Sequence, residues 1–246
     1  RVPEVGMAAV SYAVGPALLA ALDPMVADGI RFVFAIGGYH DIVASITYLT
    51  TGAYRPDAAA PWRFEPVFES AKWLFLDANA GRVGPPDDVV LKEIAGIRLD
   101  DPDAPAASLA ARLGPDGRAV YRLLTNEDPD RVPELFAALP RDLRRQIEDL
   151  DLSRRDLGRL EADLILVHGR NDPMVPYTQS VELARAAPPE RATLFLVDDL
   201  LHVELGLPAL GDALTLIAAS YRLLSERDAL PRPSFGDRDR ANGSAR

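Results

Sequence analysis

The stretch Val5-Gly-Met-Ala-Ala-Val-Ser-Tyr-Ala-Val-Gly-Pro-Ala-Leu-Leu-Ala-Ala-Leu22 decides the fold. Val5–Val10 is a short apolar run suited to a strand buried on both faces, and Ala13–Leu22 has the alanine and leucine content of a helix. Pro16 falls in the first turn of that helix, where its missing amide hydrogen costs little. The stretch therefore predicts a strand, a sharp turn that carries Ser11, and a helix.

The same stretch runs for 18 residues without a charge, which is the minimum length of a transmembrane segment. Two glycines, a serine and Pro16 interrupt it, and alanine, its most frequent residue, gains little free energy in lipid. A secretory signal is a poor match as well, because Arg1 is offset by Glu4 and the chain does not begin with Met. We expect no transmembrane span and favour a cytoplasmic location.

Composition narrows the function classes. With 246 residues, 48% of them hydrophobic and 26% charged, the chain is long enough to bury a sizeable core. A net charge of −10 without a basic stripe argues against nucleic acid as a partner. The sequence has no Cys, three scattered His and no glycine-rich phosphate loop, so we expect neither a metal ion nor a cofactor. Oligomeric state cannot be deduced from these values.

Three further apolar runs predict strands. They cover residues 31–36, followed by Gly37-Gly38, residues 162–168, followed by Gly169, and residues 192–197. Residues 181–187, between the last two runs, have a helical pattern. Apolar strands that alternate with helices predict an α/β fold with a mainly parallel sheet and flanking helices.

The region between Thr51 and Glu161 has a different character. Its helical stretches are interrupted by Pro and Gly, and it contains no strand comparable with the others; the expected helices cover 67–80, 88–95, 107–113, 118–124, 132–139 and 143–150. We therefore expect core segments at 1–50 and 162–231, the latter ending in a helix over 207–224, and a helical cap insertion at 51–161. The polar tail, 232–246, is expected to be disordered.

Ser11 occupies a position with chemical meaning. On a tight strand-to-helix turn, a serine oxygen stands above the sheet with the helix amino terminus beneath it. Neighbouring backbone comes close there, so the flanking residues must be small. They are Ala9 and Ala13 here, in place of the glycines that usually flank such a serine.

Two later segments carry an acid and a histidine. In His168-Gly-Arg-Asn-Asp-Pro-Met-Val-Pro176, Asp172 follows a strand end within a turn constrained by Gly and Pro. In Asp198-Asp-Leu-Leu-His202, the histidine follows the last predicted strand. Side chains after parallel strands gather at the carboxyl edge of the sheet, where catalytic groups are common. The chain order is serine, acid, histidine.

This order, with the serine on an elbow, resembles the α/β-hydrolase superfamily, in particular serine hydrolases with a helical cap. The resemblance implies that Ser11 is the nucleophile, His202 the general base, and Asp172 the group that orients the imidazole. It also implies that Tyr12 supplies one oxyanion-hole amide. The implied activity is hydrolysis of a small, apolar carboxylic ester through an acyl-enzyme, and acyl transfer by the same triad or a non-catalytic scaffold are the alternatives.

Several polar residues have competing interpretations. Asp41 follows the second strand and is the alternative acid. His168, at a strand end, is expected to hydrogen-bond the loop that carries Asp172, and His40 to face the surface or the cap. In the superfamily the nucleophile follows the fifth strand, whereas here it is residue 11. The resemblance therefore implies the carboxyl-terminal part of a longer hydrolase, with an open strand edge and little or no turnover of its own.

Overall fold

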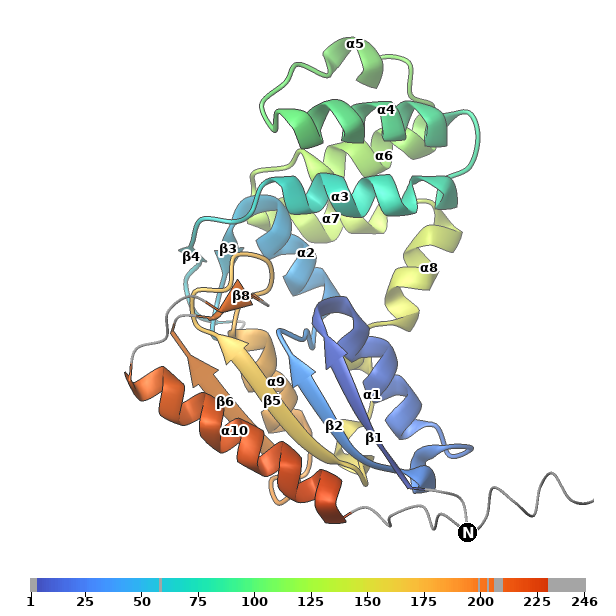
Figure 1. Cartoon of the computed structure of the whole chain (residues 1–246). Coiled ribbons are helices and arrows are strands. Elements are labelled where there is room, and N and C mark those ends of the chain that lie inside the picture. Colours follow the sequence, from blue (N-terminus) through green and yellow to red (C-terminus); the bar gives the residue numbers. More distant parts are fainter. Residues whose placement is uncertain (1–3, 58, 199, 203, 206–209, 230–246) are drawn as a thin grey trace, which may run out of the picture.

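The computed structural model describes residues 4–57, 59–198, 200–202, 204–205 and 210–229 (Figure 1). Its central sheet has four parallel strands in the order β1-β2-β5-β6. The strands are β1 (Val5–Val10), β2 (Ile30–Ile36), β5 (Asp163–Gly169) and β6 (Ala192–Val197). The predicted α/β class with a mainly parallel sheet is confirmed.

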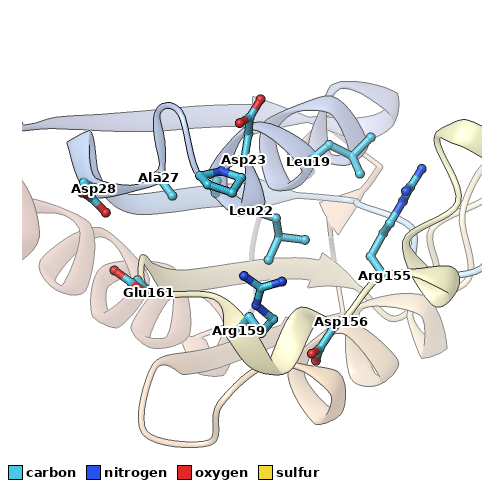
Figure 2. A pocket seen from close by; sticks show the side chains of 11 residues that line it. Leu19, Leu22, Asp23, Ala27, Asp28, Arg155, Asp156, Arg159 and Glu161 are labelled. Atoms are coloured by element: carbon cyan, nitrogen blue, oxygen red, sulfur yellow. The ribbon is translucent and has the colours of Figure 1, made fainter.

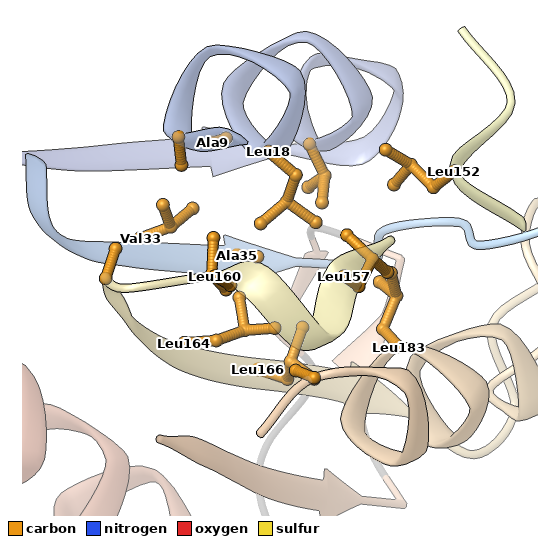
Figure 3. Close-up of a cluster of buried hydrophobic side chains, with 14 of the residues drawn as sticks. Ala9, Leu18, Val33, Ala35, Leu152, Leu157, Leu160, Leu164, Leu166 and Leu183 are labelled. Carbon is orange, nitrogen blue, oxygen red and sulfur yellow. The ribbon is translucent and has the colours of Figure 1, made fainter. Parts of the chain in front are cut away.

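Helices cover the two faces of the sheet. On one face, α1 (Val14–Leu22) and α9 (Thr178–Ala186) bury their leucines against the strands, and Figure 3 shows Leu18 pointing from α1 toward β2. On the other face, α10 (Leu210–Ala229) packs against β6 and β5. The middle of β5 is therefore fully buried on both sides.

Strand β1 differs from its prediction. Its Ala9 is buried, but Val5 and Val10 are 48% and 43% exposed, so burial on both faces was wrong. Only α1 packs closely over β1, and within the described sheet β1 has a neighbour on one side, β2. Apolar composition alone cannot reveal this, because exposure depends on which elements lie beside the strand.

The chain leaves the sheet after β2 and returns at β5, and the intervening helices lie beyond the carboxyl ends of the strands (Figure 1). They begin with α2 (Ile42–Thr51) and a short antiparallel pair, β3 (Ala53–Tyr54) and β4 (Arg63–Phe64). The remaining helices are α3 (Ser70–Asn79), α4 (Asp87–Asp100), α5 (Ala107–Ala110), α6 (Pro115–Leu124), α7 (Val132–Ala137) and α8 (Arg141–Asp149). The expected helices in this region are all present, with bounds shifted by a few residues.

Short elements complete the chain. Three-residue 3-10 helices occur at η1 (Ser11–Ala13), η2 (Ala27–Gly29), η3 (Ala80–Arg82), η4 (Pro129–Arg131), η5 (Leu152–Arg154) and η6 (Leu157–Arg159), and β7 (Leu200–Leu201) pairs with β8 (Glu204–Leu205). Helix α2 and the β3–β4 pair were not predicted. The final helix was expected over 207–224, of which 207–209 lie outside the described residues, as does the 232–246 tail.

The inserted helices have a core of their own. Trp73, Leu91 and Ile94 are among its buried side chains, and it shares no buried residue with the cluster beside the sheet, although three partly buried side chains pack against both: Val43, Ile46 and Ile147. Buried Asp87 accepts hydrogen bonds from the amides of Gly114 (2.6 Å) and Gly117 (2.7 Å), and so satisfies the first turn of α6. This second core gives the insertion its shape above the sheet.

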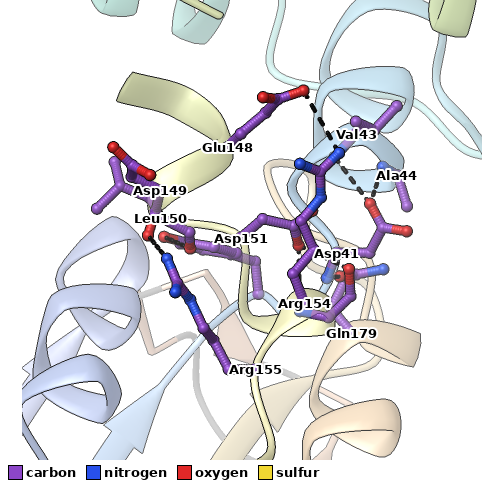
Figure 4. Close-up of polar contacts among 12 residues, drawn as sticks. Asp41, Val43, Ala44, Glu148, Asp149, Leu150, Asp151, Arg154, Arg155 and Gln179 are labelled. Carbon is purple, nitrogen blue, oxygen red and sulfur yellow. Dashed lines mark hydrogen bonds and ion pairs between the residues drawn. The ribbon is translucent and has the colours of Figure 1, made fainter. Parts of the chain in front are cut away.

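Polar contacts tie the two ends of the insertion to the core (Figure 4). The Gln179 Oε1 atom, on α9, accepts from the amides of His40 (2.9 Å) and Asp41 (2.8 Å), just before α2. At the other end, Arg154 forms ion pairs through Nη2 with Glu148 Oε1 (3.4 Å) and through Nε with Asp151 Oδ2 (3.3 Å). No helix in the described ranges combines the length and apolarity that crossing a membrane requires.

Candidate active site

Ser11 is the first residue after β1 and opens η1, the 3-10 helix that leads into α1, in a left-handed conformation with φ of 54°. That conformation is strained for a residue with a side chain. Close packing imposes it: a Cβ on Gly15 would lie 1.9 Å from the Tyr39 hydroxyl, and one on Gly38 would lie 2.6 Å from the Val14 side chain. The elbow therefore presses α1 onto the turn after β2 and leaves Ser11 partly exposed at the helix amino terminus.

Asp172 and His202 are brought together from segments 30 residues apart. His202 Nδ1 lies 2.8 Å from Asp172 Oδ2, and both side chains are buried. A carboxylate only accepts hydrogen bonds, so Nδ1 carries the proton and Nε2 is left with a lone pair. His202 follows β7 with φ of 57°, a second left-handed residue of the site. Asp199, part of the predicted loop, lies outside the described residues.

The turn around Asp172 holds its carboxylate in the ionised form. Burial acts to raise the pKa, but contacts with His168 and His202 outweigh it and lower the pKa from 3.8 to about 2. The other carboxylate oxygen, Oδ1, accepts from the amides of Met174 (2.8 Å) and Val175 (3.0 Å). Asp172 is therefore a fixed negative charge behind the imidazole.

Gly37 links this pair to Ser11. Val10 pairs with Ile36, the last residue of each strand, so Ser11 and Gly37 follow paired positions on adjacent strands. A Cβ built on Gly37, whose φ is 60°, would lie 3.2 Å from His202 Nδ1 and 3.4 Å from Asp172 Oδ2. The imidazole and the carboxylate therefore lie against Gly37, next to the strand end that carries Ser11.

Tyr12 follows Ser11, and its ring is exposed. The ring stacks on Tyr39 with centroids 6.3 Å apart and meets the edge of Phe75, on α3, at 5.7 Å. It therefore connects the elbow with the inserted helices. Its backbone amide is the one predicted for the oxyanion hole, and that role remains a prediction.

The remaining predicted residues have other positions. Asp41 caps α2, accepting from the amides of Val43 (2.8 Å) and Ala44 (2.9 Å), while the acid that hydrogen-bonds His202 is Asp172. His40 is half-buried, and its burial lowers its pKa. His168 contacts the Asp172 loop through the Val175 carbonyl, as expected.

Two cavities, with volumes of about 380 Å³ and about 520 Å³, are lined by different kinds of residues. The larger lies between the elbow and the inserted helices; Ser11 and Tyr12 line it together with apolar side chains such as Ile46, Phe75, Leu139 and Ile147. The smaller, shown in Figure 2, lies at the end of α1 away from Ser11 and is lined by charged groups including Asp28 and Arg159. Only the larger adjoins the serine.

Three contributors to the site were not identified as such from the sequence. The sequence predicts Gly37 only as part of a turn, and it does not predict that the His202 side chain lies against it. Tyr48, on α2, donates to the Asp172 carbonyl at 2.9 Å, and Ser180, on α9, contacts His168 at 2.6 Å. A serine or tyrosine within a helix carries no local signal for such contacts. In the described residues, no group of three His, Asp or Glu is arranged to hold a metal ion.

Comparisons with known proteins find similarity in structure. No protein-family model and no curated sequence matches the chain. It is similar to a meta-cleavage product hydrolase from Pseudomonas fluorescens IP01 (17% identity, TM-score 0.43, covering 91% of this chain and 66% of that one). It is also similar to a rice cell wall degrading esterase from Xanthomonas oryzae (11% identity, TM-score 0.46, covering 92% of this chain and 58% of that one). A third similar structure is an α/β hydrolase from a Medee basin deep-sea metagenome library (11% identity, TM-score 0.37, covering 90% of this chain and 66% of that one). The chain spans less than two thirds of the length of these proteins.

Proposed function

We propose that this chain carries the catalytic site of a serine hydrolase of the α/β-hydrolase type that cleaves a carboxylic ester. The observation that carries the proposal is the hydrogen-bonded His202–Asp172 pair lying against Gly37, beside the strained Ser11. A nucleophile, a base and a group that orients the base are the parts that acyl transfer requires.

The roles that we assign follow from the hydrogen bond between His202 Nδ1 and Asp172, which leaves Nε2 of His202 able to accept a proton. Ser11 Oγ attacks the ester carbonyl while His202 Nε2 takes its proton, and Asp172 stabilises the imidazolium that forms. The tetrahedral intermediate collapses as Nε2–H protonates the departing alcohol, which leaves an acyl group on Ser11. Water, deprotonated by the same nitrogen, attacks the acyl group, and the acid leaves as Ser11 regains its proton.

Charge develops on the carbonyl oxygen in both steps. The Tyr12 amide follows the nucleophile at the amino terminus of η1 and α1, where the backbone dipoles favour an anion. We assign it one oxyanion hydrogen bond. Losing one such donor typically slows an enzyme by roughly 10²- to 10³-fold, so the rate depends on how many donors surround that oxygen.

The substrate class follows from the larger cavity. Its walls are mostly Ile, Leu, Val and Phe side chains, and polar groups such as Asn79, Arg82 and Gln146 complete the lining. An apolar acyl or alcohol group of modest size fits a volume of about 520 Å³. The inserted helices, as a cap over 51–161, would exclude water from the ester bond.

The test is covalent labelling with a fluorophosphonate, which reacts with activated serines. We expect labelling of the wild-type chain at Ser11, which needs an activated serine but no catalytic turnover, and none of Ser11→Ala. Ser45→Ala is the matched control, because Ser45 also lines the cavity but hydrogen-bonds the Asp41 carbonyl and should leave labelling unchanged. His202→Ala should slow labelling by at least about 10³-fold.

Two outcomes would refute the proposal. One is a folded wild-type chain, with native circular dichroism, that takes up no probe at any pH between 6 and 9. The other is labelling that persists in Ser11→Ala. Either would favour a scaffold without hydrolytic chemistry.

A further inference from the structure

Behind Asp172 lies a hydrogen-bonded pair that ester hydrolysis does not use directly. His168, near the end of β5, and Ser180, on α9, are both fully buried. His168 Nδ1 and Ser180 Oγ are 2.6 Å apart. Burying two polar side chains costs free energy unless they satisfy each other, so a pair of this kind has a structural or functional cause.

The second ring nitrogen of His168 determines how the pair is protonated. Nε2 lies 3.0 Å from the Val175 carbonyl oxygen and 3.3 Å from Asp172 Oδ2. Both of these oxygens only accept hydrogen bonds, so Nε2 carries the proton. In the neutral imidazole Nδ1 is then the acceptor, and the Ser180 hydroxyl donates to it. In this arrangement the serine fixes the orientation of the His168 ring.

This N–H reaches both ends of the turn that carries the acid. Asp172 Oδ1 is already occupied by the amides of Met174 and Val175, and Oδ2 lies between His202 Nδ1 at 2.8 Å and His168 Nε2 at 3.3 Å. Tyr48 is a further titratable group that contacts the turn, and its hydroxyl donates to the Asp172 carbonyl. Rotation of the carboxylate would break contacts on both oxygens.

We propose that Ser180 and His168 are a positioning pair, which aims Oδ2 of Asp172 at Nδ1 of His202. This rests on the proposed function, in that His202 is taken to be the base. Without the His168 N–H, the carboxylate keeps its two backbone donors but loses the one that fixes Oδ2 from behind. More of its negative charge then faces His202, which favours the imidazolium form and removes the base at moderate pH.

The first experiment compares His168→Leu with His168→Gln. Glutamine can retain a donor near the position of Nε2, whereas leucine fills similar space without one. For leucine, we expect fluorophosphonate labelling at pH 8 to slow by about 10- to 100-fold, because small errors in the geometry of the base are costly. We also expect the rise of its labelling rate with pH to move to higher pH, and the glutamine variant to keep the wild-type profile. Identical profiles for all three chains would overturn the proposal.

A second readout does not depend on activity. The chain has three His, so two-bond 15N–1H spectra can identify the tautomer of each. We expect His168 to have a protonated Nε2 and an unprotonated Nδ1 at pH 8, the pH of the labelling assay. Ser180→Ala should disturb this pattern and slow labelling, while Ser180→Thr, which keeps the hydroxyl, should restore both. A proton on Nδ1 in the wild-type chain would refute the pair even if Ser11 is labelled, and an unlabelled wild type with the expected tautomer would refute only the hydrolase.

Discussion

At the scale of single residues, strain and chemistry coincide. Ser11 and His202 are non-glycine residues with left-handed backbone, at φ of 54° and 57°. Each such residue costs on the order of 1–3 kcal/mol and persists only where its surroundings enforce it. Both belong to the proposed site, although they are far apart in the sequence. Ser11 lines the larger cavity and the His202 imidazole lies against Gly37, so the proposed function would explain both conformations.

Gly37→Ala tests how closely the histidine must lie against the strand end. The new Cβ would meet His202 Nδ1 at 3.2 Å, so we expect labelling of Ser11 to slow by about 100-fold. Gly84→Ala is the matched control, because Gly84 also has positive φ, 86°, but its Cβ would meet nothing within 4 Å. Both variants should lose about 1–2 kcal/mol of unfolding free energy in urea. Equal labelling rates in the two variants would contradict the assigned position of His202.

Asp172 predicts a pH dependence of stability. Its pKa is about 2 in the folded chain, against an ordinary value of 3.8, so the folded state binds fewer protons between these pH values than the unfolded state. The stabilisation, about 2 kcal/mol, is present above pH 4 and is lost as the pH falls toward 2. Urea unfolding of wild type and Asp172→Asn at pH 6, 4 and 2.5 measures it. We expect the gap between the two to shrink on acidification, whereas a constant gap would contradict the lowered pKa.

At the scale of elements, the apolar runs predicted the sheet well and α2 not at all. β6 has its predicted bounds, because a continuous apolar run needs only burial to become a strand. In α2, most residues are β-branched, which lowers helix propensity: Ile42, Val43, Ile46, Thr47, Thr50 and Thr51. The helix forms because Asp41 caps it and Tyr48 is buried against the Asp172 turn. The sequence also allowed Asp41 as the acid, because a carboxylate that caps a helix and a catalytic carboxylate can both occur just after a strand.

The site divides in the same way. Ser11, Asp172 and His202 could be predicted as site residues because each follows a predicted strand, and parallel strands collect such residues at one edge. The positive φ of Gly37 and the contact between His168 and Ser180 arise only when β2, β5 and α9 are packed together. Their sequence neighbourhoods contain no periodic or spacing signal for those contacts. The sequence therefore predicts which chemical groups the site contains, but not the tertiary contacts that hold them in place.

The inserted helices should behave as a unit because the buried side chains of their core pack among themselves and none of them belongs to the sheet core. Leu91→Ala, at a fully buried position of α4, should cost about 2–5 kcal/mol. We expect amide exchange to quicken in α3, α4 and α6 and to change little in β2 and β5. Val89→Ala, at an exposed position of the same helix, is the control. Equal acceleration in the sheet would mean that cap and sheet unfold together.

At the scale of the whole molecule, exposed apolar side chains on β1 and on α10 are relevant to association. On the open side of β1, Val5 and Val10 are exposed. On the outer face of α10, the exposed side chains form a stripe, spaced three, four and three residues apart: Leu214, Ile217, Tyr221 and Leu224. The opposite face of α10 buries Ala219 toward the sheet. Surfaces of this kind promote association, and a net charge of −10 opposes it.

Which effect wins can be measured. We expect the isolated chain to self-associate above micromolar concentration, more strongly at high salt, because salt screens the negative charge while leaving apolar contacts intact. Replacing two residues of the α10 stripe, as Ile217→Gln with Tyr221→Gln, should lower the weight-average mass in light scattering and leave Ser11 labelling unchanged. Val89→Gln removes an equally exposed apolar side chain from α4 without touching the stripe. A mass independent of concentration in all three chains would show that repulsion dominates, and an effect equal in the α4 variant would locate association away from α10.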